Sequence, residues 1–155
     1  MEKLMITTFT DPMMGLTYEC EPISMPDLHL FDEQHRSSLP LNLAYKAAQL
    51  ADIDRVDQFL KNLRHATIVD VLPTTHFDVI LKVVRDTGID EDKFTQHYND
   101  GTAQAELEKD LAFTRELNIR TLPAYLIQYG ERAVIVRSLI DFENFVSMIE
   151  QLKED

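Results

Sequence analysis

The sequence predicts an α/β fold in which one early strand and a late hairpin enclose a long helical block. Residues 3–9 have the apolar and β-branched content of a strand. Residues 41–112 repeat apolar side chains at helical spacing, whereas residues 122–137 form two strand-like runs around Gly130. The length of 155 residues is typical of one domain.

Most helices are predicted from their apolar spacing, and several also have recognisable end signals. A first helix is expected after Pro12, with Met14, Leu16 and Cys20, and it should be disturbed at Glu21-Pro22. The other predicted helices comprise residues 41–51, 56–63, 77–86, 90–98, 102–112 and 141–149. Thr75 and Asp78 have the spacing of a capping box, and Gly88 is a suitable terminator for the same helix. Acidic residues favour the first turn of the helix at 90–98, and Asp141 is the expected cap of the last helix.

The last two of these helices are expected to be amphipathic. The apolar side of the helix at 102–112 comprises Ala103, Leu107, Leu111 and Ala112. The apolar side of the last helix comprises Phe142, Phe145, Val146 and Ile149. Between these helices, residues 122–129 and 133–137 are predicted to pair as antiparallel strands across a turn at Gly130–Glu131.

Composition narrows the classes of partner. The chain is 45% hydrophobic and 27% charged, as in ordinary globular domains, and its net charge is −12. This charge disfavours binding to nucleic acid or to an anionic membrane, and it fits either a solvated acidic surface or a basic protein partner. No apolar stretch reaches the ~20 residues that span a bilayer. No signal peptide is recognisable, so a cytoplasmic location is expected.

A short motif follows the first strand. It reads Thr-Asp-Pro-Met-Met-Gly-Leu-Thr over residues 10–17 and continues Tyr-Glu-Cys-Glu-Pro over residues 18–22. This motif resembles the start of DsbA-like thioredoxin-fold proteins, in particular the FrnE-type dithiol isomerases. In that family Asp-Pro ends the strand and Cys-x-x-Cys opens the next helix. The resemblance places Met14 and Thr17 at the two cysteine positions.

Three further stretches resemble the same family in order and spacing, namely residues 43–48, 87–90 and 118–125. The resemblance implies one DsbA-like domain over residues 1–155, a thioredoxin fold with an inserted helical subdomain. Residues 1–31 and 118–153 would form the thioredoxin core, and residues 38–117 the helical insert.

The second strand region of that family is shortened or missing in this chain. Residues 23–40 stand where the family has a longer interval, and they contain two prolines. Either Leu28–Phe31 is a short residual strand, or part of a longer chain is absent from this sequence.

The family's thiol chemistry is expected to be absent. Disulfide exchange requires a thiolate and a second sulfur within reach, but Met14 has no ionisable proton and the Thr17 hydroxyl stays protonated. Cys20 is the single cysteine, so an intramolecular disulfide cannot form. Cys20 is interpreted either as a small buried apolar residue or as a thiol that acts alone.

The resemblance also implies a groove that faces a cis-proline at Pro123, where the backbone of Leu122 would pair with an extended peptide. Met13 and Met14 either form an exposed apolar patch or pack under the helix start. The candidate groove residues are Met13, Met14, Gly15, Leu16, Thr17, Leu122 and Pro123.

The leading hypothesis is a redox-inactive DsbA-like protein that binds a peptide or protein partner in this groove. Related proteins act as adaptors that deliver a regulator to a protease. The alternative is a thiol-disulfide oxidoreductase or isomerase that acts through Cys20, and a structural subunit is a third class. No cofactor is implied. The five histidines lack the spacing of zinc ligands, so no metal site is expected.

Overall fold

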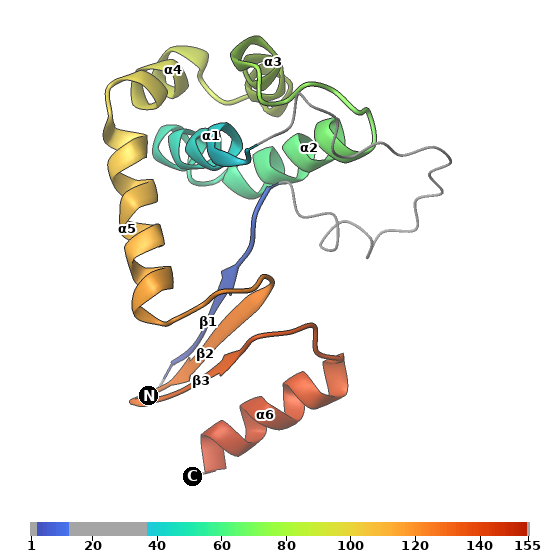
Figure 1. The fold of residues 1–155 in the computed structure, drawn as a ribbon, viewed down its shortest axis with the longest axis vertical. Coiled ribbons are helices and arrows are strands. Elements are labelled where there is room, and N and C mark those ends of the chain that lie inside the picture. Colours follow the sequence, from blue (N-terminus) through green and yellow to red (C-terminus); the bar gives the residue numbers. More distant parts are fainter. Residues whose placement is uncertain (1–2, 13–36, 155) are drawn as a thin grey trace. The chain divides into compact units, whose positions relative to one another are not determined.

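The computed structural model describes residues 3–12 and 37–154, and these residues form six helices and three strands (Figure 1). They divide into two compact units, which we call the sheet unit (residues 1–10 and 113–155) and the helical unit (residues 11–112). The elements are β1 Leu4–Phe9, α1 Leu39–Ala51, α2 Val56–Ile68, α3 Phe77–Thr87, α4 Glu91–Asn99, α5 Thr102–Glu116, β2 Ala124–Tyr129, β3 Arg132–Val136 and α6 Phe142–Glu154.

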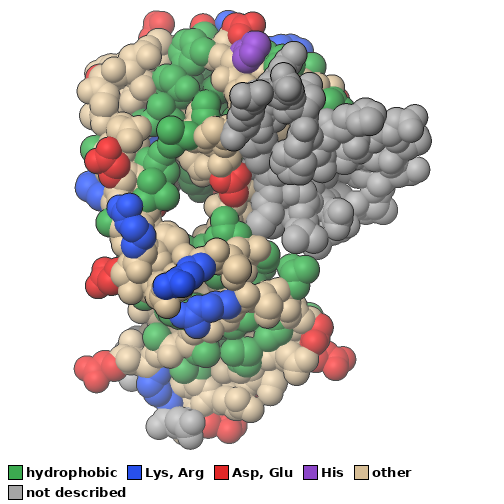
Figure 2. Space-filling model, viewed as in Figure 1, with side chains coloured by type: hydrophobic (Ala, Val, Ile, Leu, Met, Phe, Trp, Pro, Cys, Tyr) green, Lys and Arg blue, Asp and Glu red, His purple; other side chains and the backbone are tan. Residues whose placement is uncertain are grey.

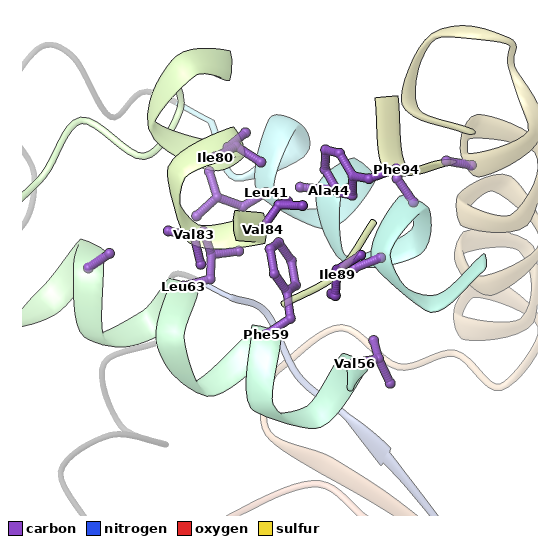
Figure 3. Packing of buried hydrophobic residues seen from close by; sticks show 14 residues of the cluster. Leu41, Ala44, Val56, Phe59, Leu63, Ile80, Val83, Val84, Ile89 and Phe94 are labelled. Atoms are coloured by element: carbon purple, nitrogen blue, oxygen red, sulfur yellow. The ribbon is translucent and has the colours of Figure 1, made fainter. Parts of the chain in front are cut away.

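The helical unit is built around a core to which α1, α2, α3, α4 and the start of α5 contribute (Figure 3). Phe59 of α2 and Phe94 of α4 are fully buried, with ring centroids 6.0 Å apart. The α1 residues in the core include three alanines, whose small side chains allow neighbouring helices to approach closely. The apolar spacing that predicted these helices therefore identifies the side that packs inward.

The ends of the middle helices follow local signals with one exception. Gly88 ends α3 in the left-handed region with φ 78°, as predicted. Asp90 caps α4, where its carboxylate accepts a hydrogen bond from the Lys93 backbone N–H at 3.0 Å. The predicted capping box of α3 is wrong, because His76 is the N-cap residue and no side-chain cap bond forms there.

The sheet unit contains an antiparallel sheet in the order β1-β2-β3. Phe9 of β1 pairs with Ala124, and Tyr125 of β2 pairs with Val136 of β3, which confirms the predicted hairpin. The predicted first strand of the hairpin began too early, since β2 starts at Ala124. The two preceding residues thus lie outside the described sheet.

Helix α6 packs on β2 and β3, where the ring of Phe145 meets that of Tyr125 edge-on at 6.1 Å. The predicted cap is confirmed, because Asp141 accepts from the Asn144 backbone N–H at 2.9 Å. However, Phe142 is 79% exposed and no α6 residue is buried. The predicted apolar side of this helix is therefore only partly covered.

The predicted apolar side of α5 is also only partly buried. Ala103 is buried in the core of the helical unit and Leu107 is also buried, whereas Leu111 is 45% exposed. The predicted apolar side of α5 is thus buried only in its first two turns. Beyond them, Phe113 contacts Phe9 of β1 within the sheet unit, with ring centroids 5.9 Å apart.

These elements agree with the predicted α/β class. The predicted residual strand at residues 28–31 lies outside the described residues. Among the helices that the structure describes, none combines the length and apolar character needed to cross a bilayer.

Candidate functional site

Two of the predicted groove residues, Leu122 and Pro123, belong to the described structure. The remaining predicted positions lie outside the described residues, namely Met13, Met14, Gly15, Leu16, Thr17 and Cys20. The described part of the candidate site is therefore the Leu122–Pro123 segment, within the sheet unit.

The segment at Leu122 connects the end of α5 to the start of β2. The peptide bond between Leu122 and Pro123 is cis. Pro123 is buried, whereas Leu122 is 41% exposed. In the described part of the chain, the backbone N–H and C=O of Leu122 form no hydrogen bond. An exposed residue beside a strand end thus has backbone groups that an extended peptide can pair with.

A tight turn at the end of α5 sets the position of this segment. Asn118 adopts φ 52°, in the left-handed region that asparagine tolerates better than most residues. The Ile119 backbone N–H then donates to the Thr114 carbonyl at 3.0 Å, and the Ile119 side chain is buried. The chain is thereby anchored three residues before Leu122.

Two arginines contact the same turn. Nη2 of Arg137, just after β3, lies 3.3 Å from the Leu117 carbonyl oxygen. Nε of Arg120 donates to Oδ1 of Asn118 at 2.9 Å. Both arginines are exposed. Sequence reasoning missed them as site residues, because nothing local marks an arginine after a strand as a neighbour of a turn twenty residues earlier.

A separate polar cluster lies in the helical unit at the start of α1. Oδ2 of Asp11 accepts hydrogen bonds from Oγ of Ser38 at 2.6 Å and from Nδ2 of Asn42 at 2.9 Å. Burial lowers the pKa of Arg64, an effect that the nearby carboxylate of Asp11 partly opposes. The hydrogen bonds from Ser38 and Asn42 fix the side chain of Asp11. Asp11 is followed by Pro12, which is the last described residue before residue 37.

No metal centre is found in the described ranges, where no three His, Cys, Asp or Glu side chains are grouped suitably. His65 lies 3.3 Å from Asp70, and both are about half exposed. A hollow of about 270 Å³ with a mixed polar and apolar lining lies at these residues in the helical unit. It is lined by Asn62, His65, Ala66, Asp70, Leu72, Val79, Lys82, Val83 and Asp86. Neither Leu122 nor Pro123, the two described candidate site residues, lines it.

Similar proteins are found by sequence and by structure. SpxH proteins, named ClpXP adapter proteins, match from Bacillus cereus with 23% identity over 124 residues and from Halalkalibacterium halodurans with 25% over 138 residues. These matches cover 77% and 85% of this chain, but 42% and 45% of the relatives. The chain therefore spans less than half the length of the curated relatives that it matches.

Two solved structures share the fold. A candidate protein disulfide isomerase from Nitrosomonas europaea has a TM-score of 0.67 and 16% identity, over 75% of this chain and 57% of that chain. The cytosolic disulfide reductase DsbM from Pseudomonas aeruginosa has a TM-score of 0.61 and 18% identity, over 81% of this chain and 67% of that chain.

The family itself is shown by a sequence model. The model Thioredoxin_5, described as thioredoxin, matches residues 4–143. This match includes the first strand, the helical block and the hairpin. Since it covers most of the 155 residues, the chain belongs to this DsbA-like family of thioredoxin-fold proteins.

Proposed function

We propose that this protein binds a peptide or protein partner through the Leu122–Pro123 segment and does not catalyse dithiol–disulfide exchange. The observation that carries the redox-inactive part of the proposal is the single cysteine of the chain. Exchange within one chain needs two sulfurs, and Met14 and Thr17 stand where the resemblance places the thiols.

The SpxH relatives support the binding part of the proposal. They are named ClpXP adapter proteins, and an adapter works by binding other proteins. Because this chain matches less than half of their length, partner binding is the only part of their role that we carry over. A cytoplasmic location belongs to the same proposal, and it is supported by the cytosolic DsbM among the structures that share the fold.

The geometry at Leu122 supports this segment as the contact. Its side chain is 41% exposed next to buried Pro123, and its backbone groups have no hydrogen-bond partner in the described residues. Strand addition uses such backbone groups for affinity and the neighbouring side chains for specificity. We include residues 13–17 in the proposed groove on the basis of the family resemblance.

A second candidate function is thiol–disulfide chemistry through Cys20. The names of the two structural neighbours, a candidate disulfide isomerase and a disulfide reductase, favour this alternative. A single thiolate would form a mixed disulfide with a substrate, and an external thiol would then have to release the product.

One pair of experiments separates the two functions. Insulin reduction is measured with glutathione as the thiol source, for the wild type and for Cys20→Ser. We expect no rate above the uncatalysed reaction for either protein. A rate that disappears in Cys20→Ser would establish the thiol function and overturn the redox-inactive proposal.

Binding is tested with a random heptapeptide library displayed on phage and selected on the full chain. Selected peptides should bind Leu122→Asp at least about tenfold more weakly, because a charged side chain removes the apolar contact. Ile53→Asp is the matched control, since Ile53 is a 61% exposed apolar residue in the helical unit. Peptides that bind Leu122→Asp as tightly as the wild type would place the binding site elsewhere.

A further inference from the structure

We propose that the Leu122 segment selects peptides that carry Asp or Glu next to an apolar residue. This inference rests on the proposed partner binding and names the chemistry of the partner. The selecting groups are the guanidinium groups of Arg120 and Arg137.

The two arginines lie at the same turn as the proposed contact. Arg120 bonds to the side chain of Asn118, and Arg137 lies against the carbonyl of Leu117, the preceding residue. Arg137 also follows Val136, which pairs with Tyr125 in β2. If the antiparallel register is continued by one residue, the backbone of Arg137 comes opposite Ala124. Ala124 is the first residue of β2 and follows Pro123 in the chain.

Neither guanidinium group has a carboxylate counter-charge among the residues that the structure describes. Among the described residues, no carboxylate forms an ion pair with Arg120 or Arg137. Each arginine makes one hydrogen bond there, although a guanidinium has five N–H donors. Donors on both side chains are consequently available to a ligand.

This arrangement contrasts with the charge of the whole chain, which is −12. Figure 2 shows Asp and Glu side chains on both units, and Lys and Arg side chains that lie next to each other on the sheet unit. The guanidinium groups of Arg120 and Arg137 both bond to the turn at residues 117–118, so their charges add in the field that a carboxylate ligand at this turn would meet. The charge pattern is thus complementary to an acidic partner, although the net charge would favour a basic one.

The chemistry of the side chains defines the ligand further. A guanidinium binds a carboxylate through two parallel N–H···O bonds, which adds geometric specificity to the attraction. The half-exposed Leu122 side chain provides apolar surface, and its backbone provides strand pairing. The ligand that fits best is an extended segment with one apolar residue and one or two adjoining carboxylates. It can pair with the Leu122 backbone, contact the Leu122 side chain and bind the guanidinium groups.

The test uses the same displayed heptapeptide library on the full chain. Peptides selected on the wild type should be enriched in Asp and Glu. The variant Arg120→Gln/Arg137→Gln should lose that enrichment and bind a synthetic selected peptide roughly threefold to tenfold more weakly, as expected for two exposed ion pairs. Binding to the wild type should also weaken when salt rises from about 50 mM to about 500 mM.

The matched control is Lys82→Gln/Arg85→Gln, which removes two charges from exposed positions on α3 in the helical unit. This control changes the net charge by the same amount as Arg120→Gln/Arg137→Gln, and it should leave peptide binding unchanged. An equal loss in the control would mean that only net charge matters, and would overturn the inference. Arg120→Gln alone keeps the contact between Arg137 and Leu117 and should still weaken binding roughly twofold, should the double variant unfold.

The remaining outcomes separate this inference from the proposed function. Peptides that depend on Leu122 but show no acidic preference would overturn the inference and leave the partner-binding proposal in place. An acidic preference that persists in Arg120→Gln/Arg137→Gln would also overturn it. If the wild type selects no peptide, the proposed function is wrong and this inference falls with it.

Discussion

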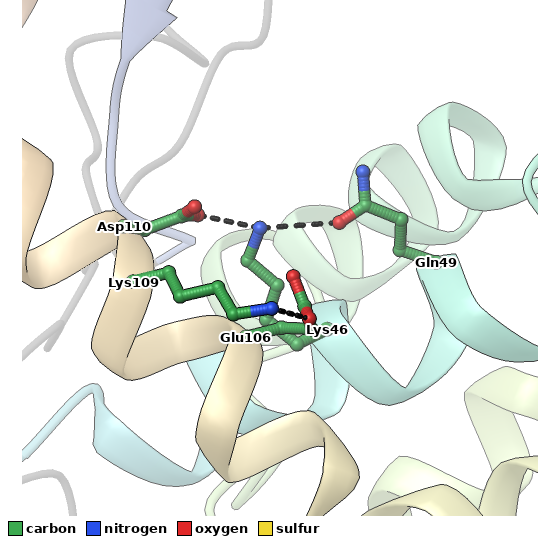
Figure 4. A network of polar contacts seen from close by, with 5 residues as sticks. All are labelled: Lys46, Gln49, Glu106, Lys109 and Asp110. Carbon is green, nitrogen blue, oxygen red and sulfur yellow. Dashed lines mark hydrogen bonds and ion pairs between the residues drawn. The ribbon is translucent and has the colours of Figure 1, made fainter.

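Lys46 of α1 and Asp110 of α5 form an ion pair in the helical unit, with Nζ 2.5 Å from Oδ2 (Figure 4). The Lys46 side chain is 10% exposed, whereas that of Asp110 is 57% exposed. Nζ of Lys46 also donates to Oε1 of Gln49 at 3.1 Å. A nearly buried ammonium is therefore paired with an exposed carboxylate.

We expect Asp110→Ala to lower the free energy of unfolding by about 1–2 kcal/mol, because it leaves the Lys46 ammonium without its carboxylate. Lys109→Ala is the control, since it removes an exposed ion pair with Glu106 on the same helix and should cost less than about 0.5 kcal/mol. Urea unfolding of both variants measures the difference. Equal losses would show that the burial of Lys46 contributes nothing.

The core of the helical unit should be far more sensitive to truncation than the exposed side of α6. Phe59→Ala removes a fully buried ring that contacts Phe94, and should cost about 3–5 kcal/mol. Phe142→Ala changes a ring that is 79% exposed and should stay within about 0.5 kcal/mol of the wild type. Thermal unfolding followed by circular dichroism checks both. A large loss for Phe142→Ala would indicate that this side of α6 is covered in solution.

Gly88 should resist substitution for a backbone reason. The atoms nearest to a Cβ at this position belong to the Arg55 side chain and lie 3.8 Å away or farther, which is ordinary contact distance. The φ of 78° is unfavourable for residues with a side chain, and Gly88→Ala should cost about 1–2 kcal/mol. Gly88→Asn should cost less, because asparagine tolerates the left-handed region. The order of the two variants in urea unfolding is the decisive measurement, and a reversed order would contradict this explanation.

The cap of α6 should make part of the stability dependent on pH. The Asn144 backbone N–H, which donates to Asp141, holds the pKa of this carboxyl below its usual value. A lowered pKa in the folded state stabilises the protein above the unfolded pKa of about 4, and this contribution is lost as pH falls through the folded value. Asp141→Asn keeps a good cap residue at every pH. In acid titrations, the stability difference between wild type and variant should therefore shift in favour of the variant below about pH 4.

The position of the missing thiols leads to a test of the family resemblance. Met14→Cys combined with Thr17→Cys places two thiols at the positions that the resemblance assigns to Cys-x-x-Cys. Under mild oxidation the double variant should form an internal disulfide, and a helix start should lower the pKa of the first thiol. Mass spectrometry after thiol alkylation measures this, with Met14→Cys alone as the control. If no disulfide forms, the assignment of these two positions is wrong.

The sequence alone determined the features that depend on near neighbours in the chain. Gly88 and Asp141 mark helix ends, since caps and terminators act within one turn. The hairpin around Gly130 follows from two strand-like runs separated by a turn. The absence of an internal disulfide follows from the presence of a single cysteine.

The tertiary structure decided which apolar side chains are buried and which residues far apart in the sequence contact each other. Apolar spacing predicted the helices that carry Phe59 and Phe142 alike, yet the first ring is fully buried and the second is 79% exposed. Lys46 has no local mark of burial, and Arg137 reaches Leu117 only through the strand register. Periodicity shows which side of a helix is apolar, but burial depends on how much surface distant elements bring to it.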